Sequence, residues 1–299
     1  MVMKGQKQIL AILLFFVFAT VLIAEEYFVS FLDGLVDLKT NRGWQALSIG
    51  DSLTAASVVR LESDSMLEIS FKQSIITIYD EGIYNLQNLV TSSEEMQAFA
   101  FLQIIDSKID KAVNGSDSER SVAFGVRGPL IEEESTIDFM EEEDDPVEQG
   151  MERLNAGNFD EAIEYFKTAM EQGVTLEEEP FVYYLLAYAH AEKQERAQAL
   201  KYLNKIKISA DHLLYTDYVM LKGRLLVESF AYNSALLLFE EYLTYNSTGE
   251  TVQSVLLLSS FCYKGLGNNY KYKECLKKAK EINPYSELGK EAHRLLIEI

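Results

Sequence analysis

The stretch GMERLNAGNFDEA, residues 150–162, opens a pattern that recurs through the second half of the chain. Small residues return at intervals of 37, 36 and 37 residues, at Gly150, Ala187, Gly223 and Ser260. A second row follows twelve residues after each of these and consists of Ala162, Ala199, Ala235 and Tyr272. A period of this length is typical of stacked helical hairpins. Because such a stack forms a long concave surface and no buried reaction centre, binding is the first functional hypothesis.

Apolar residues within each copy fall at helical intervals, so each helix has one face that a neighbour must cover. In the first copy this face consists of Ala162, Ile163, Phe166 and Ala169. On these residues, segment 146–299 resembles the tetratricopeptide repeat (TPR) family, a helix-turn-helix unit with small residues where its helices touch. The resemblance implies an α-solenoid of about four hairpins. The tail 286–299 is similar to the capping helix that closes such an array.

The TPR resemblance also implies where a partner would bind. In that family the fifth and ninth positions of each repeat line a concave groove. Those positions here are Val147, Met151, Tyr184, Tyr188, Met220, Arg224, Leu257 and Phe261. This mostly apolar row favours an amphipathic helix or extended peptide, with Tyr188 and Arg224 available to a partner and dispensable for stability. Ordinary packing between helices is the alternative.

The segment 27–89 is rich in β-branched residues and broken by turn signals, which is typical of strands. Residues 66–71 alternate in polarity and 75–79 form a short apolar run, so we expect several short antiparallel strands. One amphipathic helix should follow, beginning at Ser92 and Ser93 and ending near Asn114. A further strand is predicted over 121–126.

Gly34-Leu35-Val36, Gly43–Leu47 and Gly50–Leu53 resemble the opening of FecR-like extracytoplasmic domains. Residues 121–128 are similar to the late Val-Arg-Gly stretch of that family, and the match spans 27–130. The resemblance implies an all-β sandwich or barrel of the bacterial cell envelope that acts through contacts. Trp44, the only tryptophan, is expected to pack in the core or a turn and not to form a ligand platform.

Two further segments adjoin these domains. Lys4 and Lys7 precede an uncharged apolar run from Ile9 to Ile23, which predicts a signal peptide over 1–24. An uncleaved inner-membrane anchor is the alternative, although a membrane span usually needs about 20 apolar residues. Residues 131–145 belong to a strongly acidic stretch, which predicts an extended linker. Calcium binding is disfavoured there because the ligand spacing of a calcium loop is missing.

Composition and the absence of certain sequence motifs exclude several classes of function. The 299 residues include 27 basic and 47 acidic side chains, and this net charge of −20 opposes binding to nucleic acid or an anionic membrane surface. No phosphate loop, nucleophile elbow or paired histidine ligands occur, so we expect no catalytic residues, metal or cofactor. Cys262 and Cys275 cannot build a disulfide framework. One disulfide between them and two free thiols are both open alternatives.

These features together predict a two-domain α+β protein, with an N-terminal all-β FecR-like sandwich or barrel with one helix and a C-terminal α-solenoid. We expect a non-enzymatic adaptor, periplasmic or otherwise exported, that binds an envelope protein or peptide. Membrane contact is expected only through an uncleaved amino-terminal segment. The alternatives are a cell-wall (glycan) binding accessory protein and a membrane-anchored sensor or transducer.

Overall fold

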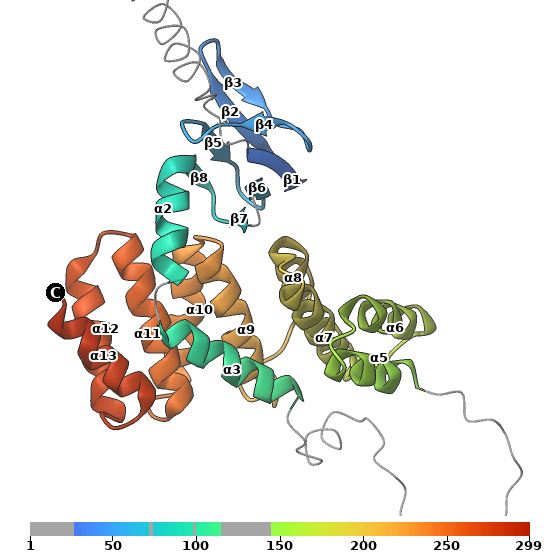
Figure 1. The fold of residues 1–299 in the computed structure, drawn as a ribbon. Coiled ribbons are helices and arrows are strands. Elements are labelled where there is room, and N and C mark those ends of the chain that lie inside the picture. The colour runs from blue at the N-terminus through green and yellow to red at the C-terminus, as the bar shows by residue number, and fades with distance from the viewer. Residues whose placement is uncertain (1–26, 72–73, 98–99, 115–144) are drawn as a thin grey trace, which may run out of the picture.

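The computed structural model describes residues 27–71, 74–97, 100–114 and 145–299. These residues form a strand-rich N-terminal part and a helical C-terminal part, as the sequence predicts. The two parts pack against each other, and helices from the first part lie along the second (Figure 1). The predicted signal peptide, the strand over 121–126 and the acidic linker up to residue 144 lie outside the described residues.

The N-terminal part is a β domain of two antiparallel four-stranded sheets, ordered β4-β1-β6-β7 and β3-β2-β5-β8. Alternating side chains such as Val59, Leu67 and Ile78 are fully buried in its core. In β6, four consecutive residues are buried because its second face contacts helix α8. The strands are β1 (Tyr27–Asp33), β2 (Val36–Thr40), β3 (Gly43–Ala46), β4 (Ser52–Leu53), β5 (Val58–Leu61), β6 (Met66–Phe71), β7 (Ser74–Ile78) and β8 (Gly82–Asn85).

The prediction of one helix beginning at Ser92 is wrong. Two helices follow the strands, α2 (Leu86–Gln97) and α3 (Ala100–Asn114). The first begins six residues earlier because the Asn85 side chain accepts the backbone N–H of Gln87 at 3.0 Å and caps the helix directly after β8. The second contacts α9 and α13, so it lies in space with the C-terminal helices.

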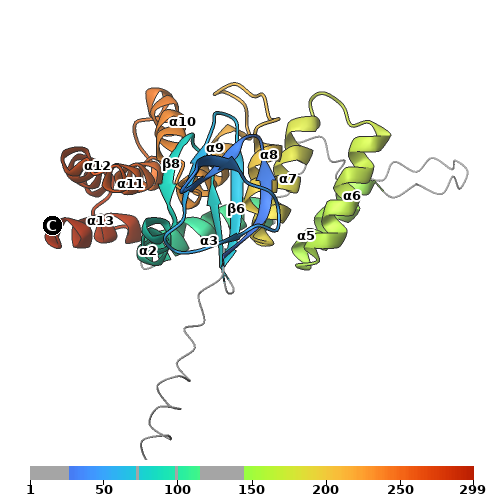
Figure 2. The same cartoon turned by 90° about the horizontal axis from the view of Figure 1, so that it is seen from above.

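Neighbouring C-terminal helices pack as pairs, α5 with α6, α7 with α8, α9 with α10 and α11 with α12, and α13 covers α12. The pairs follow one another in a row with the sheets over its middle (Figure 2). Within the described ranges, no helix combines the length and apolarity needed to cross a bilayer. The helices are α5 (Pro146–Asn155), α6 (Phe159–Gln172), α7 (Glu179–Glu192), α8 (Arg196–Leu203), α9 (Tyr215–Glu228), α10 (Tyr232–Tyr245), α11 (Glu250–Gly265), α12 (Asn269–Ile282) and α13 (Glu287–Ile297).

The periodic small residues are explained by the bulk of a residue sixteen positions later. A Cβ atom at Gly150 would lie 2.4 Å from Cε1 of Phe166, and one at Gly223 would lie 2.2 Å from Cε1 of Phe239. In the other two pairs the later residue is leucine, and the earlier one is Ala187 or Ser260. All these side chains are buried. Glycine therefore occurs where the facing helix presents phenylalanine, because a larger residue would separate the helices.

Both cysteines are free thiols in the structure, which is one of the two alternatives that the sequence left open. Cys262 on α11 is fully buried, and burial raises the pKa of its thiol well above the usual value. Cys275 on α12 is half-buried, and burial raises its pKa to about 11. Both thiols are therefore protonated and weakly nucleophilic at neutral pH.

Candidate partner-binding groove

The predicted groove residues lie on the first helices of the pairs, and helix α3 of the same chain occupies the middle of this face. Figure 1 shows α3 lying across α9. Four apolar side chains anchor it in the core: Phe101, Leu102, Ile105 and Ile109. Burial of a large apolar side chain contributes about 1.5–3 kcal/mol, so this stripe provides most of the docking free energy.

Arg224 on α9 binds the polar edge of α3. Its Nε donates to Oδ1 of Asp106 at 2.8 Å, and its Nη2 donates to Oδ2 at 3.2 Å. Nη2 also lies 2.8 Å from Oε1 of Glu228, one turn further along α9. Arg224 is only 8% exposed, and burial opposes its charge, but the two carboxylates outweigh this effect and raise its pKa. A fork of this kind fixes both the position and the rotation of α3.

A second contact lies one turn further along α3. The hydroxyl of Tyr188 on α7 donates to Oδ1 of Asp110 at 3.0 Å. Lys108, between the two aspartates, forms an ion pair with Glu250 at the start of α11. The polar edge of α3 is thus held by residues of three different helices of the array.

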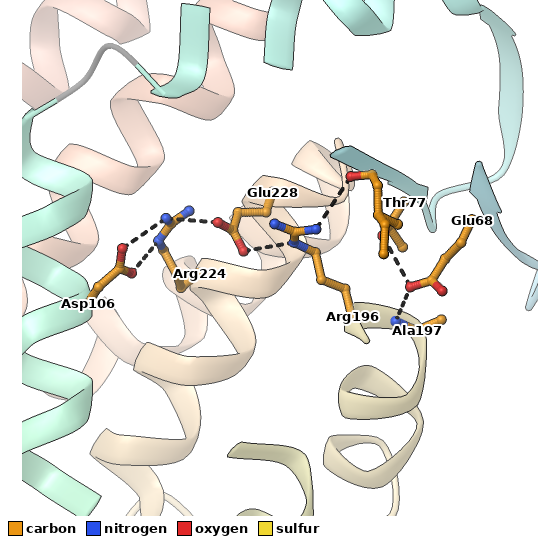
Figure 3. Close-up of polar contacts among 8 residues, drawn as sticks. Glu68, Thr77, Asp106, Arg196, Ala197, Arg224 and Glu228 are labelled. Atoms are coloured by element: carbon orange, nitrogen blue, oxygen red, sulfur yellow. Dashed lines mark hydrogen bonds and ion pairs between the residues drawn. The ribbon is translucent and has the colours of Figure 1, made fainter. Parts of the chain in front are cut away.

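The ion pairs continue from α3 towards the β domain (Figure 3). Oε2 of Glu228 accepts from Nε of Arg196 at 3.1 Å, and Nη1 of Arg196 reaches the carbonyl of Ile75 in β7 at 3.4 Å. Arg196 is the first residue of α8, so one row of charged groups extends from α3 through α9 and α8 to the sheet. The β domain, α3 and the array are therefore linked into one packed unit.

Two carboxylates of the β domain cap helices of the array. Oε1 of Glu68 accepts the backbone N–H of Ala197 at 2.8 Å, and Oδ2 of Asp80 accepts that of Asn233 at 3.2 Å. These amides belong to the first turns of α8 and α10, neither of which has a capping side chain of its own. Burial raises the pKa of Glu68 although this hydrogen bond opposes the shift. Capping satisfies helix donors that would otherwise stay unpaired, and it positions the β domain on the array.

The other predicted groove residues divide into three groups. Tyr184 and Met220 line a cavity of about 310 Å³ beside Lys108 and Ile109 of α3. Val147 lines a separate cavity of about 180 Å³ between α5, α6 and α7, and Met151 is half-buried. Leu257 is completely buried, and Phe261 packs edge-on against Tyr232 at 6.0 Å between ring centroids. These last two residues pack between helices, which was the alternative interpretation.

The expectation that Tyr188 and Arg224 are dispensable for stability does not fit this geometry, because both are buried and hold α3. Their partners Asp106 and Asp110 were not predicted from the sequence. Glu228 was not predicted either, although its position four residues after Arg224 is a recognisable helical ion-pair spacing. The capping carboxylates carry no comparable sequence signal because they are far from their helices in the chain.

Trp44 does not lie in the core. It belongs to edge strand β3 and is 36% exposed, with the guanidinium of Arg60 stacked 4.8 Å from the ring centroid. Arg60 in turn forms an ion pair with Asp37 on the neighbouring strand at 2.5 Å. One face of the indole is therefore covered by a cation of the same sheet.

No family model and no curated protein matches this chain. Among solved structures, MamA from Desulfovibrio magneticus RS-1 is similar, with 19% identity, a TM-score of 0.41, and coverage of 51% of this chain and 88% of MamA. YrrB, a TPR protein with an unusual peptide-binding site, has 18% identity, a TM-score of 0.42 and coverage of 70% and 89%. TTC0263, a TPR protein of Thermus thermophilus, has 18% identity, a TM-score of 0.37 and coverage of 51% and 80%.

Proposed function

We propose that this protein is a non-enzymatic TPR-type adaptor of the cell envelope that binds a partner protein or peptide through the concave face of its helical array. The observation that carries this proposal is the docking of α3 on that face. Its apolar stripe is buried, and Arg224 and Tyr188 bind the acidic side chains at its edge. A surface that holds a helix of the same chain has the shape and chemistry to hold a helix of another.

The β domain is the second interaction module in this proposal, with the FecR-like fold that its sequence resembles. The caps by Glu68 and Asp80 hold it on α8 and α10. Sheet β3-β2-β5-β8 keeps exposed side chains, including Ile83 at 65% exposure, which a second partner could cover. The apolar run from Ile9 to Ile23 after Lys4 and Lys7 supports export of the protein.

Position-specific photo-crosslinking in cells tests the adaptor function. Thr216 lines the cavity beside α3, whereas Thr168 is exposed on α6, away from α3. A photoreactive amino acid at position 216 should give a discrete protein adduct that is identifiable by mass spectrometry, and the same residue at position 168 should not. Equal adducts at both positions, or none at 216, would refute the proposal. Retention of the purified protein on isolated cell wall would instead support the glycan-binding alternative.

A further inference from the structure

Helix α3 carries a short internal repeat that the array binds at both copies. Its central sequence, residues 105–110, is IDSKID, so two Ile-Asp pairs are separated by one helical turn. Ile105 and Ile109 are 0% and 6% exposed. Asp106 is bound by Arg224 on α9 and Asp110 by Tyr188 on α7. The array therefore recognises one pattern, a large apolar residue followed by an acid, at two adjacent sites.

Three observations indicate that α3 is an imperfect occupant. Nη1 of Arg224 is buried and has no hydrogen-bond acceptor among the described residues. Glu192 is an exposed residue, but its carboxylate is partly desolvated beside α3, and this desolvation followed by repulsion from Asp110 and Asp106 raises its pKa. A cavity of about 310 Å³, open to solvent, remains beside Ile109. The buried donor costs free energy in the docked state because it lacks an acceptor, and the cavity leaves part of the groove beside α3 unfilled.

We propose that α3 is an exchangeable occupant of the groove, and that the partner is an amphipathic helix with two acidic residues four positions apart, each directly after a large apolar residue. This inference rests on the proposed adaptor function and adds the chemistry of the ligand to it. Arg224 and Tyr188 bind the two acids of the partner helix, as they bind those of α3.

A partner helix that replaces α3 loses apparent affinity because it competes with a segment of the same chain. A segment tethered in the same chain acts at an effective concentration on the order of millimolar. If α3 as a free peptide binds the empty groove with a dissociation constant of about 0.1 mM, any competing helix is weakened about tenfold while α3 is docked. A partner has to exceed α3 in affinity or act where α3 has been released.

Fluorescence anisotropy with a defined peptide tests the inference on the full chain. The probe is a labelled peptide of residues 100–114, AFLQIIDSKIDKAVN. Its protein target is the Ile105→Ser/Ile109→Ser variant, in which the apolar anchors of α3 are lost. The peptide should bind this variant about tenfold more tightly than the wild type, because the groove is no longer occupied. Absence of binding to this variant at millimolar peptide would overturn the proposal.

Recognition of the two acidic residues is tested with matched substitutions in the peptide and in the protein. A peptide with Asp106→Ala and Asp110→Ala should bind at least tenfold more weakly, since a charged hydrogen bond contributes about 1.5–3 kcal/mol. Adding Arg224→Gln or Tyr188→Phe alone to the target should remove part of this difference between the peptides, and adding both should remove most of it. If the acidic and the alanine peptides bind equally, the groove recognises only the apolar stripe and the proposed pattern is wrong.

A second variant covers the case in which the serine substitutions unfold the chain, which circular dichroism would reveal. Asp106→Lys places a cation opposite Arg224, so it weakens docking of α3 without removing the apolar anchors Ile105 and Ile109. The same peptide series applies to this variant, with the same outcomes. If the wild-type protein forms a concentration-dependent dimer and the peptide dissociates it, the groove is occupied by a second copy of this chain. That result would refute the proposal that the partner is a different protein. The crosslinking in cells can succeed or fail independently of these peptide results, so failure of the adaptor function and failure of the acidic pattern are distinguishable.

Discussion

The contact between Gly223 and Phe239 allows a quantitative test of why small residues recur in the array. A Cβ atom at position 223 would lie 2.2 Å from Cε1 and 2.7 Å from Cζ of Phe239. Carbon atoms in favourable contact lie about 3.5–4.0 Å apart. Because Phe239 is completely buried, its ring has no free space to move into. Gly223→Ala should therefore force α9 and α10 apart.

The magnitude follows from two opposing effects. Over-packing a filled core costs about 1–3 kcal/mol, and the better helix propensity of alanine returns about 0.8–1 kcal/mol. An approach of 2.2 Å to a buried ring places the over-packing cost near the upper end of its range, so we expect Gly223→Ala to lower the free energy of unfolding by about 2 kcal/mol. Phe239→Leu alone leaves a void beside the glycine and should cost about 1–3 kcal/mol. The double variant recreates the alanine and leucine found at Ala187 and Leu203. It should be more stable than the sum of the two losses predicts by about 1 kcal/mol or more.

Urea unfolding measures this cycle, with circular dichroism following the helices and Trp44 fluorescence following the β domain. The two transitions have to coincide before a single free energy is assigned. Gly150→Ala, where the added Cβ would lie 2.4 Å from the ring of Phe166, serves as a replicate of the same geometry. If Gly223→Ala is neutral, or if the losses simply add in the double variant, size complementarity does not explain the glycine.

Three further predictions concern the linking contacts and the thiols. Glu68→Ala should cost about 1 kcal/mol or more in thermal unfolding because α8 loses the acceptor for Ala197, whereas Glu68→Gln keeps an acceptor oxygen and should retain most of the stability. Glu192 has a raised pKa in the folded state, so the folded chain binds more protons and this group lowers stability as pH rises from 4.5 through the raised value. Glu192→Gln should therefore stabilise the protein at pH 7 but not near pH 4, and an equal effect at both pH values in paired thermal melts would contradict this. Cys262 and Cys275 should react slowly with iodoacetamide at pH 8 in the folded protein. In denaturant without reductant, a thiol titration should count two reactive thiols per chain, and a count below two would mean that a disulfide forms.

The local elements were largely predictable because their signals are local. Alternation in 66–71 predicted β6, and the spacing of Ala162 and Phe166 predicted the buried face of α6. The start of α2 was missed because Ser92 and Ser93 look like caps, while the capping residue is Asn85 at the end of β8. A strand that runs directly into a helix hides the boundary, since no loop separates the two patterns.

The sequence by itself determined the row of helix pairs and the position of Arg224 and Tyr188 on the first helices. Periodic burial and the glycines opposite phenylalanines are written into the chain at fixed separations. Only the tertiary structure decided what fills the face that these residues form. The contacts of Asp106 with Arg224 and of Glu68 with Ala197 join residues 118 and 129 positions apart. No periodicity in the sequence relates such distant residues. They come into contact only when the apolar faces of α3 and β6 are buried as the whole chain packs.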